Sequence, residues 1–182
     1  DDRIHACLDA GCDGVEISDG VFGILNWQPA KETLSRLQRP EVVLTIHAEL
    51  ADGVTVVDLA QKLDSLTLPI HNIVFHPTEL LLPCDLGELL WPASIENMDS
   101  STSGWQTCLE VSQAIVDSHS VGFTYDTAHI MECRIDPRSF LPLFPPVEVH
   151  LSVSTWNGSS GSKHVVTSSQ PWFPYVPLTS LV

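Results

Sequence analysis

The chain has 182 residues, of which 43% are hydrophobic, a length and composition that suit one domain with a buried core. Its formal net charge is −15 with only eight lysines and arginines, which counts against nucleic acid as a partner because phosphate binding usually needs a basic surface. No apolar run approaches the roughly 20 residues that cross a bilayer, so the sequence also argues against a membrane protein.

The first half of the chain alternates short helical and strand-like segments. Short apolar runs rich in β-branched residues are typical of buried strands, and Pro in a first turn or Gly after a last turn marks a helix end. The elements predicted in this half are a helix over 2–10 closed by Gly11, a strand over 13–18 around Glu16, a helix over 29–37, a strand ending at His47, a helix over 55–63, a strand over 73–76, and at most one helical turn near Leu86.

The second half continues the alternation and then changes character. Its predicted elements are a strand ending at Glu96, a serine-rich loop over 99–104, an amphipathic helix over 105–116, a strand ending at Asp126, a short helix over 137–143, a strand ending at His150, a loop-like stretch over 154–175 and the start of a helix near Pro177.

Strands and helices that alternate with short connections are typical of βα units around a parallel sheet. Six strands are expected, whereas a complete (β/α) barrel has eight. We therefore predict one α/β domain over residues 1–182, a parallel TIM-barrel-type sheet without its first and last strands. An open sheet is the less favoured alternative, because an unpaired parallel edge on each side would promote aggregation.

Five of the predicted strands share one feature: each ends in a residue type that can bind a metal. These residues are His47, His76, Glu96, Asp126 and His150. If the strands are parallel, their carboxyl ends converge on one face, where α/β proteins build their sites. The pattern therefore predicts a divalent metal site, and imidazole with carboxylate ligands favours Zn²⁺, Mn²⁺, Co²⁺ or Fe²⁺ over Mg²⁺.

The local motifs resemble the xylose-isomerase-like TIM barrel superfamily, which includes endonuclease IV and many sugar isomerases and epimerases. The similar segments are GCDGVEIS, LTIHAEL, IVFHPTEL, SIENMD, YDTAHI and VEVHLSV, in the family's order along the chain. The most specific is DTAH, in which Asp126 and His129 lie three residues apart.

The resemblance implies a ligand set. Glu96, Asp126 and His150 would share the metal common to the superfamily, with a fourth ligand, a glutamate on the last strand, expected beyond Val182. If the chain is similar to the endonuclease IV branch, the resemblance implies further zinc ligands at His47, His76, His129 and His164. His129 and His164 would belong to a third metal site in that branch. Ser162 stands where the branch has an aspartate, a departure that counts against this third site.

Each of these residues also has a simpler interpretation. A histidine at a strand end is often a hydrogen-bonded structural residue or a neutral donor to substrate, and an acidic one is often a helix N-cap. Glu16 is expected to be a loop-facing carboxylate or a cap. Four side chains near the predicted site face are candidates for phosphate or sugar binding, with solvated surface charge or packing as the alternatives: Arg134, Arg138, Lys163 and Trp156.

Three functions are compatible with these features. The favoured one is a metal-dependent sugar or sugar phosphate isomerase or epimerase that acts through an enediolate, with Glu96 as both ligand and acid/base, as the resemblance implies. The second is an endonuclease IV-like zinc phosphodiesterase acting on abasic DNA or another phosphoester, and the third is an inactive or fragmentary metal-binding barrel.

The number and spacing of the cysteines bear on the cellular compartment. Five cysteines, odd in number and without a Cys-x-x-Cys pair, indicate reduced thiols instead of a disulfide framework. We therefore expect a cytoplasmic protein. The isomerase interpretation, which the resemblance implies, makes a small carbohydrate the expected partner.

Overall fold

The computed structural model describes residues 1–18, 20–48, 54–76, 86, 89–97, 121–133, 138, 145–151, 153–156 and 162–165. They belong to two compact units, residues 1–93 and residues 94–182. The amphipathic helix predicted over 105–116 and the helix near Pro177 lie outside the described residues, as does nearly all of the helix predicted over 137–143.

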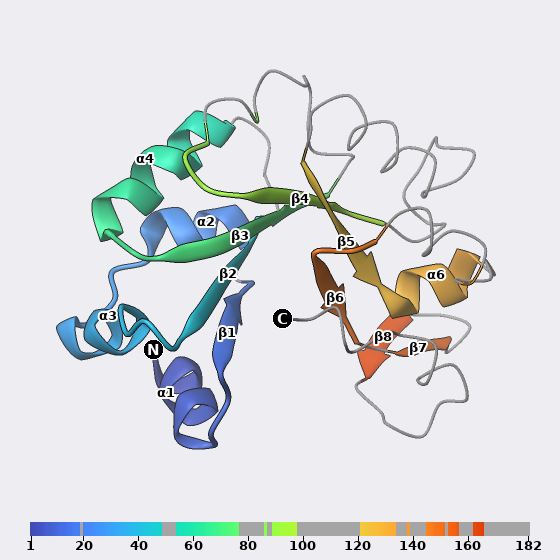
Figure 1. The fold of residues 1–182 in the computed structure, drawn as a ribbon, viewed down its shortest axis with the longest axis horizontal. Helices are drawn as coiled ribbons and strands as arrows, with labels where there is room; N and C mark the ends of the chain where they lie inside the picture. The colour runs from blue at the N-terminus through green and yellow to red at the C-terminus, as the bar shows by residue number, and fades with distance from the viewer. Residues whose placement is uncertain are drawn as a thin grey trace. The chain divides into compact units, whose positions relative to one another are not determined.

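Six strands form one sheet, and their order in the sheet is their order along the chain (Figure 1). They are β1 (Gly14–Ile17), β2 (Val43–Ala48), β3 (Ile70–Phe75), β4 (Ala93–Glu96), β5 (Gly122–Asp126) and β6 (Glu148–His150). Pairing is parallel between β1 and β2, β2 and β3, β4 and β5, and β5 and β6. This confirms the predicted fold class, an α/β fold consistent with an incomplete barrel.

The described residues of the first unit form four helices: α1 (Asp2–Asp9), α2 (Gly20–Asn26), α3 (Lys31–Leu37) and α4 (Val56–Leu66). Three of them were predicted, whereas α2 was not. Its sequence, GVFGILN, contains two glycines that lower intrinsic helix propensity, so tertiary packing must stabilise it. That packing is against α4 and β2, beside which α2 lies in Figure 1.

The helix ends follow from local sequence. After α1, Gly11 adopts a left-handed conformation with φ of +86°, as the sequence predicted for a helix closed by glycine. At the start of α4, the Thr55 hydroxyl accepts a hydrogen bond from the Asp58 N–H at 3.1 Å. The Asp58 carboxylate in turn accepts one from the Thr55 N–H at 2.9 Å. This reciprocal capping box satisfies two backbone donors that the helix itself leaves unpaired.

Strand alternation separates two faces in the first unit. In β2, Leu44, Ile46 and Ala48 are fully buried, whereas the side chains between them, including His47, point to the other face. Three leucines of the helices α3 and α4 are also fully buried, namely Leu37, Leu59 and Leu63. Each such leucine stabilises the fold by about 1.5–3 kcal/mol relative to an exposed one.

The second unit adds a helix and a hairpin to its strands. The helix α6 (Thr127–Cys133) follows β5 directly. The strands β7 (Val153–Trp156) and β8 (Ser162–Val165) pair in antiparallel fashion, so the prediction of a loop-like stretch from residue 154 was wrong at this point. The missed signal was two short segments with β-branched residues on either side of a Gly- and Ser-rich connection, which is typical of a hairpin.

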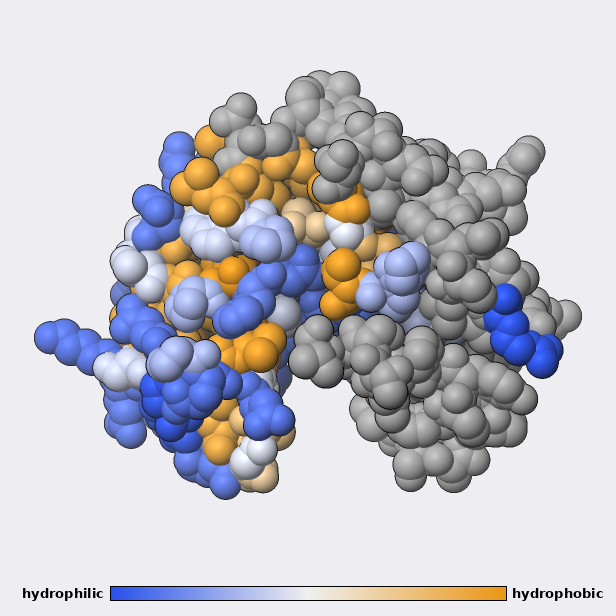
Figure 2. Space-filling model, viewed as in Figure 1, coloured by the Kyte–Doolittle hydropathy of each residue, from blue (hydrophilic) through white to orange (hydrophobic). Residues whose placement is uncertain are grey.

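The surface is mixed in polarity. Figure 2 shows apolar areas between hydrophilic ones on the visible face of the first unit. Leu90 is the most exposed large hydrophobic side chain in the described part of the chain, at 82%. No helix among the described residues has the length and apolar character needed to cross a membrane.

Candidate metal centre

The second unit brings together Glu96, Asp126 and His150, which are the last residues of β4, β5 and β6. Asp126 is paired in register with His150, and Glu96 with Thr124, two residues before Asp126. Since side chains alternate along a strand, this register puts all three ligand candidates on one face of the sheet. One ligand atom from each lies within 4.8 Å of the others, so the three could hold a metal ion.

Burial makes this cluster costly without a positive charge. Glu96 is 1% exposed and Asp126 is 2% exposed, and two buried carboxylates repel each other and lose their hydration. His150 lies against Glu96, with 2.8 Å between its Nδ1 and Oε1 of the glutamate. Glu148 approaches the other side of the same ring, with Oε1 3.5 Å from Nε2. A divalent cation would offset this concentration of negative charge, and the donor set of two carboxylates and an imidazole fits one.

Asn97 fixes the backbone of Asp126. Its side-chain amide donates to the Asp126 carbonyl at 3.0 Å, and its side-chain oxygen accepts from the Asp126 N–H at 2.9 Å. Asn97 is fully buried, so these two bonds tie the ends of β4 and β5 together in a protected site. The sequence did not identify this role, although Asn97 directly follows Glu96 in the SIENMD segment.

The DTAH segment supports the cluster through several contacts. The Asp126 carboxylate accepts a hydrogen bond from the His129 N–H at 2.8 Å, so it caps the first turn of α6. The His129 ring bonds through Nδ1 to the Asn97 carbonyl at 2.7 Å. Because a carbonyl only accepts, His129 carries its hydrogen on Nδ1. The Thr127 hydroxyl donates to the His150 carbonyl at 3.1 Å, which ties α6 to the end of β6.

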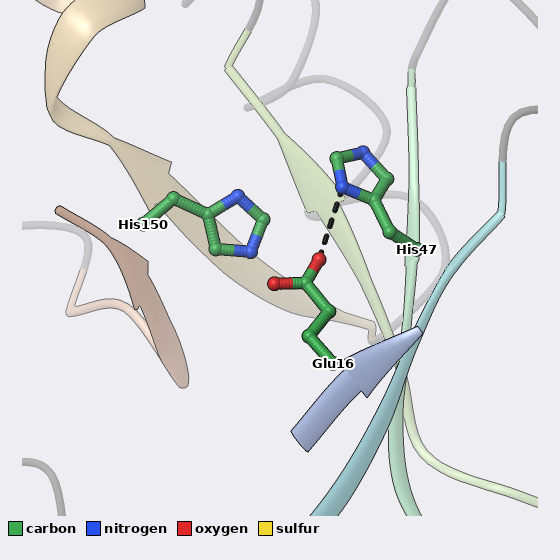
Figure 3. Close-up of side chains that lie close together, drawn as sticks. All are labelled: Glu16, His47 and His150. Carbon is green, nitrogen blue, oxygen red and sulfur yellow. Dashed lines mark ion pairs between the residues drawn. The ribbon is translucent and has the colours of Figure 1, made fainter. Parts of the chain in front are cut away.

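A second group of polar side chains lies in the first unit. His47 and His76 point their rings at each other, with 2.8 Å between the two Nε2 atoms and an edge-to-face angle of 89°. Figure 3 shows Glu16 in an ion pair with His47, whose Nδ1 lies 3.0 Å from Oε1 of the carboxylate. The sequence indicated a loop-facing carboxylate or a cap for Glu16, and did not predict this ion pair with His47.

The partner of each nitrogen defines what His47 can do. A carboxylate accepts hydrogen bonds, so it favours the form of His47 with its hydrogen on Nδ1, which directs the lone pair of Nε2 toward His76. A carboxylate on the far nitrogen is the usual way in which proteins orient a metal-binding histidine. The pair His47 and His76 could therefore serve as two imidazole ligands, with Glu16 as the group that orients one of them.

The structure describes the remaining predicted site residues in less detail. Lys163 and His164 lie in β8 and Trp156 in β7, and the backbone register pairs Lys163 with Thr155 and His164 with Ser154. Arg138 is exposed, and Arg134 lies outside the described residues.

Neither a protein-family model nor a curated protein matches the chain.

Proposed function

We propose that the protein is a divalent-metal-dependent isomerase or epimerase of sugars or sugar phosphates, of the xylose-isomerase-like type, acting through an enediolate. The observation that carries the proposal is the buried group of Glu96, Asp126 and His150 at the carboxyl ends of three strands. Its oxygen and nitrogen donors suit Zn²⁺, Mn²⁺, Co²⁺ or Fe²⁺. Such an ion, when bound, polarises a carbonyl and stabilises negative charge on the enediolate oxygens.

Glu96 is the residue best placed to move the proton. Its carboxylate is buried, and His150 holds it through a 2.8 Å contact to Oε1. We assign Glu96 the removal of a proton from the carbon next to the substrate carbonyl and its return to the neighbouring carbon. Its position favours this role because a carboxylate held in place by its neighbours can act as a general base.

The groups around Glu96 keep it in position. Asn97 joins the ends of β4 and β5, and Thr127 joins α6 to the end of β6. A reacting carbon must lie within about 3–3.5 Å of the base, so a frame that prevents small displacements supports the chemistry.

The test follows proton transfer directly. The purified protein, treated with a chelator and then reconstituted with Mn²⁺, Co²⁺ or Zn²⁺, is incubated in D₂O with a panel of aldoses, ketoses and their phosphates. We expect metal-dependent deuterium incorporation at the carbon next to the carbonyl, detected by NMR. Glu96→Gln should lose it, whereas Glu41→Gln, the same change at an exposed glutamate paired with Arg39 at 3.5 Å, should keep it. Turnover by Glu96→Gln at the wild-type rate would contradict the assignment.

The second candidate, a zinc phosphodiesterase, is favoured by the convergence of His47 and His76 at 2.8 Å. It predicts cleavage of a duplex with a single abasic site at low salt when zinc is supplied, and loss of cleavage in His76→Ala. The formal charge of −15 counts against it. Cleavage by the wild type together with no deuterium exchange would reverse the order of the two candidates. Metal binding with neither activity would support the third possibility, a metal-binding barrel without turnover.

A further inference from the structure

The turn after α1 places two cysteines at paired positions. The Gly11 N–H bonds to the Leu8 carbonyl at 3.2 Å, and the Cys12 N–H bonds to the Cys7 carbonyl at 3.2 Å. With Gly11 in the left-handed conformation, these two bonds make a Schellman motif. In this motif the residues at the positions of Cys7 and Cys12 commonly bring their side chains into contact.

The geometry puts the two Cα atoms within reach of a disulfide. The hydrogen bond joins Cys7 O to Cys12 N, and adding the bonded path from each of these atoms to its Cα gives an upper limit of about 7.4 Å. The true separation is shorter because the path is bent, and disulfides span Cα distances of about 4.4–6.8 Å. Both thiols are exposed and free, so small reagents can reach them.

We propose that Cys7 and Cys12 form a reactive dithiol that is reversibly converted to an internal disulfide by low-molecular-weight disulfides such as oxidised glutathione. One cysteine thiolate attacks a sulfur of the small disulfide, forms a mixed disulfide and releases one small thiolate. The second cysteine thiolate then attacks the cysteine sulfur, forms the Cys7–Cys12 bond and releases the second small thiolate. The two cysteines lose two protons and two electrons in total, and the small disulfide becomes two thiols.

The location gives the modification a defined structural effect. Cys12 lies two residues before Gly14, the first residue of β1. The disulfide would fix the end of α1 to the segment that enters the strand carrying Glu16. It closes a short loop around Gly11 and leaves the capping hydrogen bonds in place, so the fold accommodates both redox forms.

The sequence permits a direct test on the intact chain. Trypsin cleaves after Arg3 and after Lys31, with no lysine or arginine between them, so both cysteines fall in one peptide, residues 4–31. The folded protein is equilibrated with mixtures of reduced and oxidised glutathione, alkylated under acid quench, digested and analysed by mass spectrometry. We expect a peptide 4–31 that carries no alkyl group and is lighter by two hydrogens than the same peptide with both thiols reduced. Cys7→Ser and Cys12→Ser should instead carry one glutathione each.

A comparison with unfolded protein shows whether disulfide formation depends on the fold or only on the short distance between the two cysteines in the sequence. The same equilibration in urea measures disulfide formation when the Schellman motif is absent. We expect the equilibrium constant to be at least about 10-fold larger in the folded protein, because folding raises the effective concentration of one thiol near the other. An equal or smaller constant in the folded protein would overturn the proposal. So would wild-type peptide that carries glutathione without an internal bond, or a cross-link from this peptide to another cysteine.

Discussion

Asp126 has two separable roles, and substitution can distinguish them. Its carboxylate caps α6 through the 2.8 Å bond from the His129 N–H, and it belongs to the candidate metal group with Glu96 and His150. Asn is as good a helix cap as Asp but lacks the charge, whereas Ala lacks both. Without metal, we expect Asp126→Asn to be at least as stable as the wild type, because it keeps the cap and removes the repulsion from Glu96. We expect it to bind the metal more weakly, and Asp126→Ala to lose the cap as well.

The size of the effect follows from linkage. A metal at 100 times its dissociation constant stabilises the folded chain by about 2.7 kcal/mol, which for a chain of this length raises Tm by about 5–10 °C. Loss of a charged ligand should weaken binding at least as much as loss of a group that supports a ligand, about 10–100-fold. At the same metal concentration Asp126→Asn would then gain only about 0.4–1.4 kcal/mol, or about 1–5 °C. Asp126→Ala should lose a further ~1 kcal/mol without metal, because the cap is gone.

The assay is thermal unfolding of chelator-treated protein with and without added Zn²⁺, Mn²⁺ or Co²⁺, with Glu41→Gln as the control for removing a carboxylate at an exposed site. The control should retain the full metal-dependent rise in Tm. If Asp126→Asn shows the same rise as the wild type, the aspartate is only a helix cap and the ligand assignment is refuted.

Three further predictions concern the fold around the site. Gly14→Ala should destabilise the protein by about 1–3 kcal/mol in urea unfolding, because a Cβ at this position would press against the backbone carbonyl of Val43; a neutral effect would show that β1 can move away. The pKa of Asp58 lies below its ordinary value because its carboxylate accepts hydrogen bonds from the backbone and side chain of Thr55. The stability that these bonds contribute is present above the unfolded pKa of 3.8 and is lost as the pH falls through the lower folded pKa. Thr55→Ala should accordingly lower Tm by about 2–4 °C at neutral pH and by less in acid, and an equal loss at every pH would contradict this. Burial raises the pKa of Tyr125, so this tyrosine should not ionise while the protein is folded. In an alkaline titration, Tyr125→Phe should therefore show the same tyrosinate absorbance as the wild type up to the pH of unfolding, and a lower absorbance in the folded variant would contradict the burial.

The sequence by itself determined the six parallel strands and, within the second unit, the strand ends that carry Glu96, Asp126 and His150. Each strand is a short apolar run that is stable only when buried, and the polar residue at its end marks where the apolar run stops. For this reason the positions of Glu96, Asp126 and His150 could be predicted from local pattern and from parallel order alone. The helices α1, α3 and α4 were equally predictable, because their caps and turn residues act over a few positions.

The tertiary structure alone decided which side chains support those ligands. Asn97 looks like an ordinary loop residue in the sequence, and its role appears only when β5 brings the backbone of Asp126 beside it. Glu16 likewise becomes a partner of His47 only through the register of β1 and β2, which places residues 31 positions apart in the chain on the same sheet face. The helix α2 and the β7–β8 hairpin follow the same logic. Their local signals are weak, and contacts distant in sequence supply the free energy that local propensity does not.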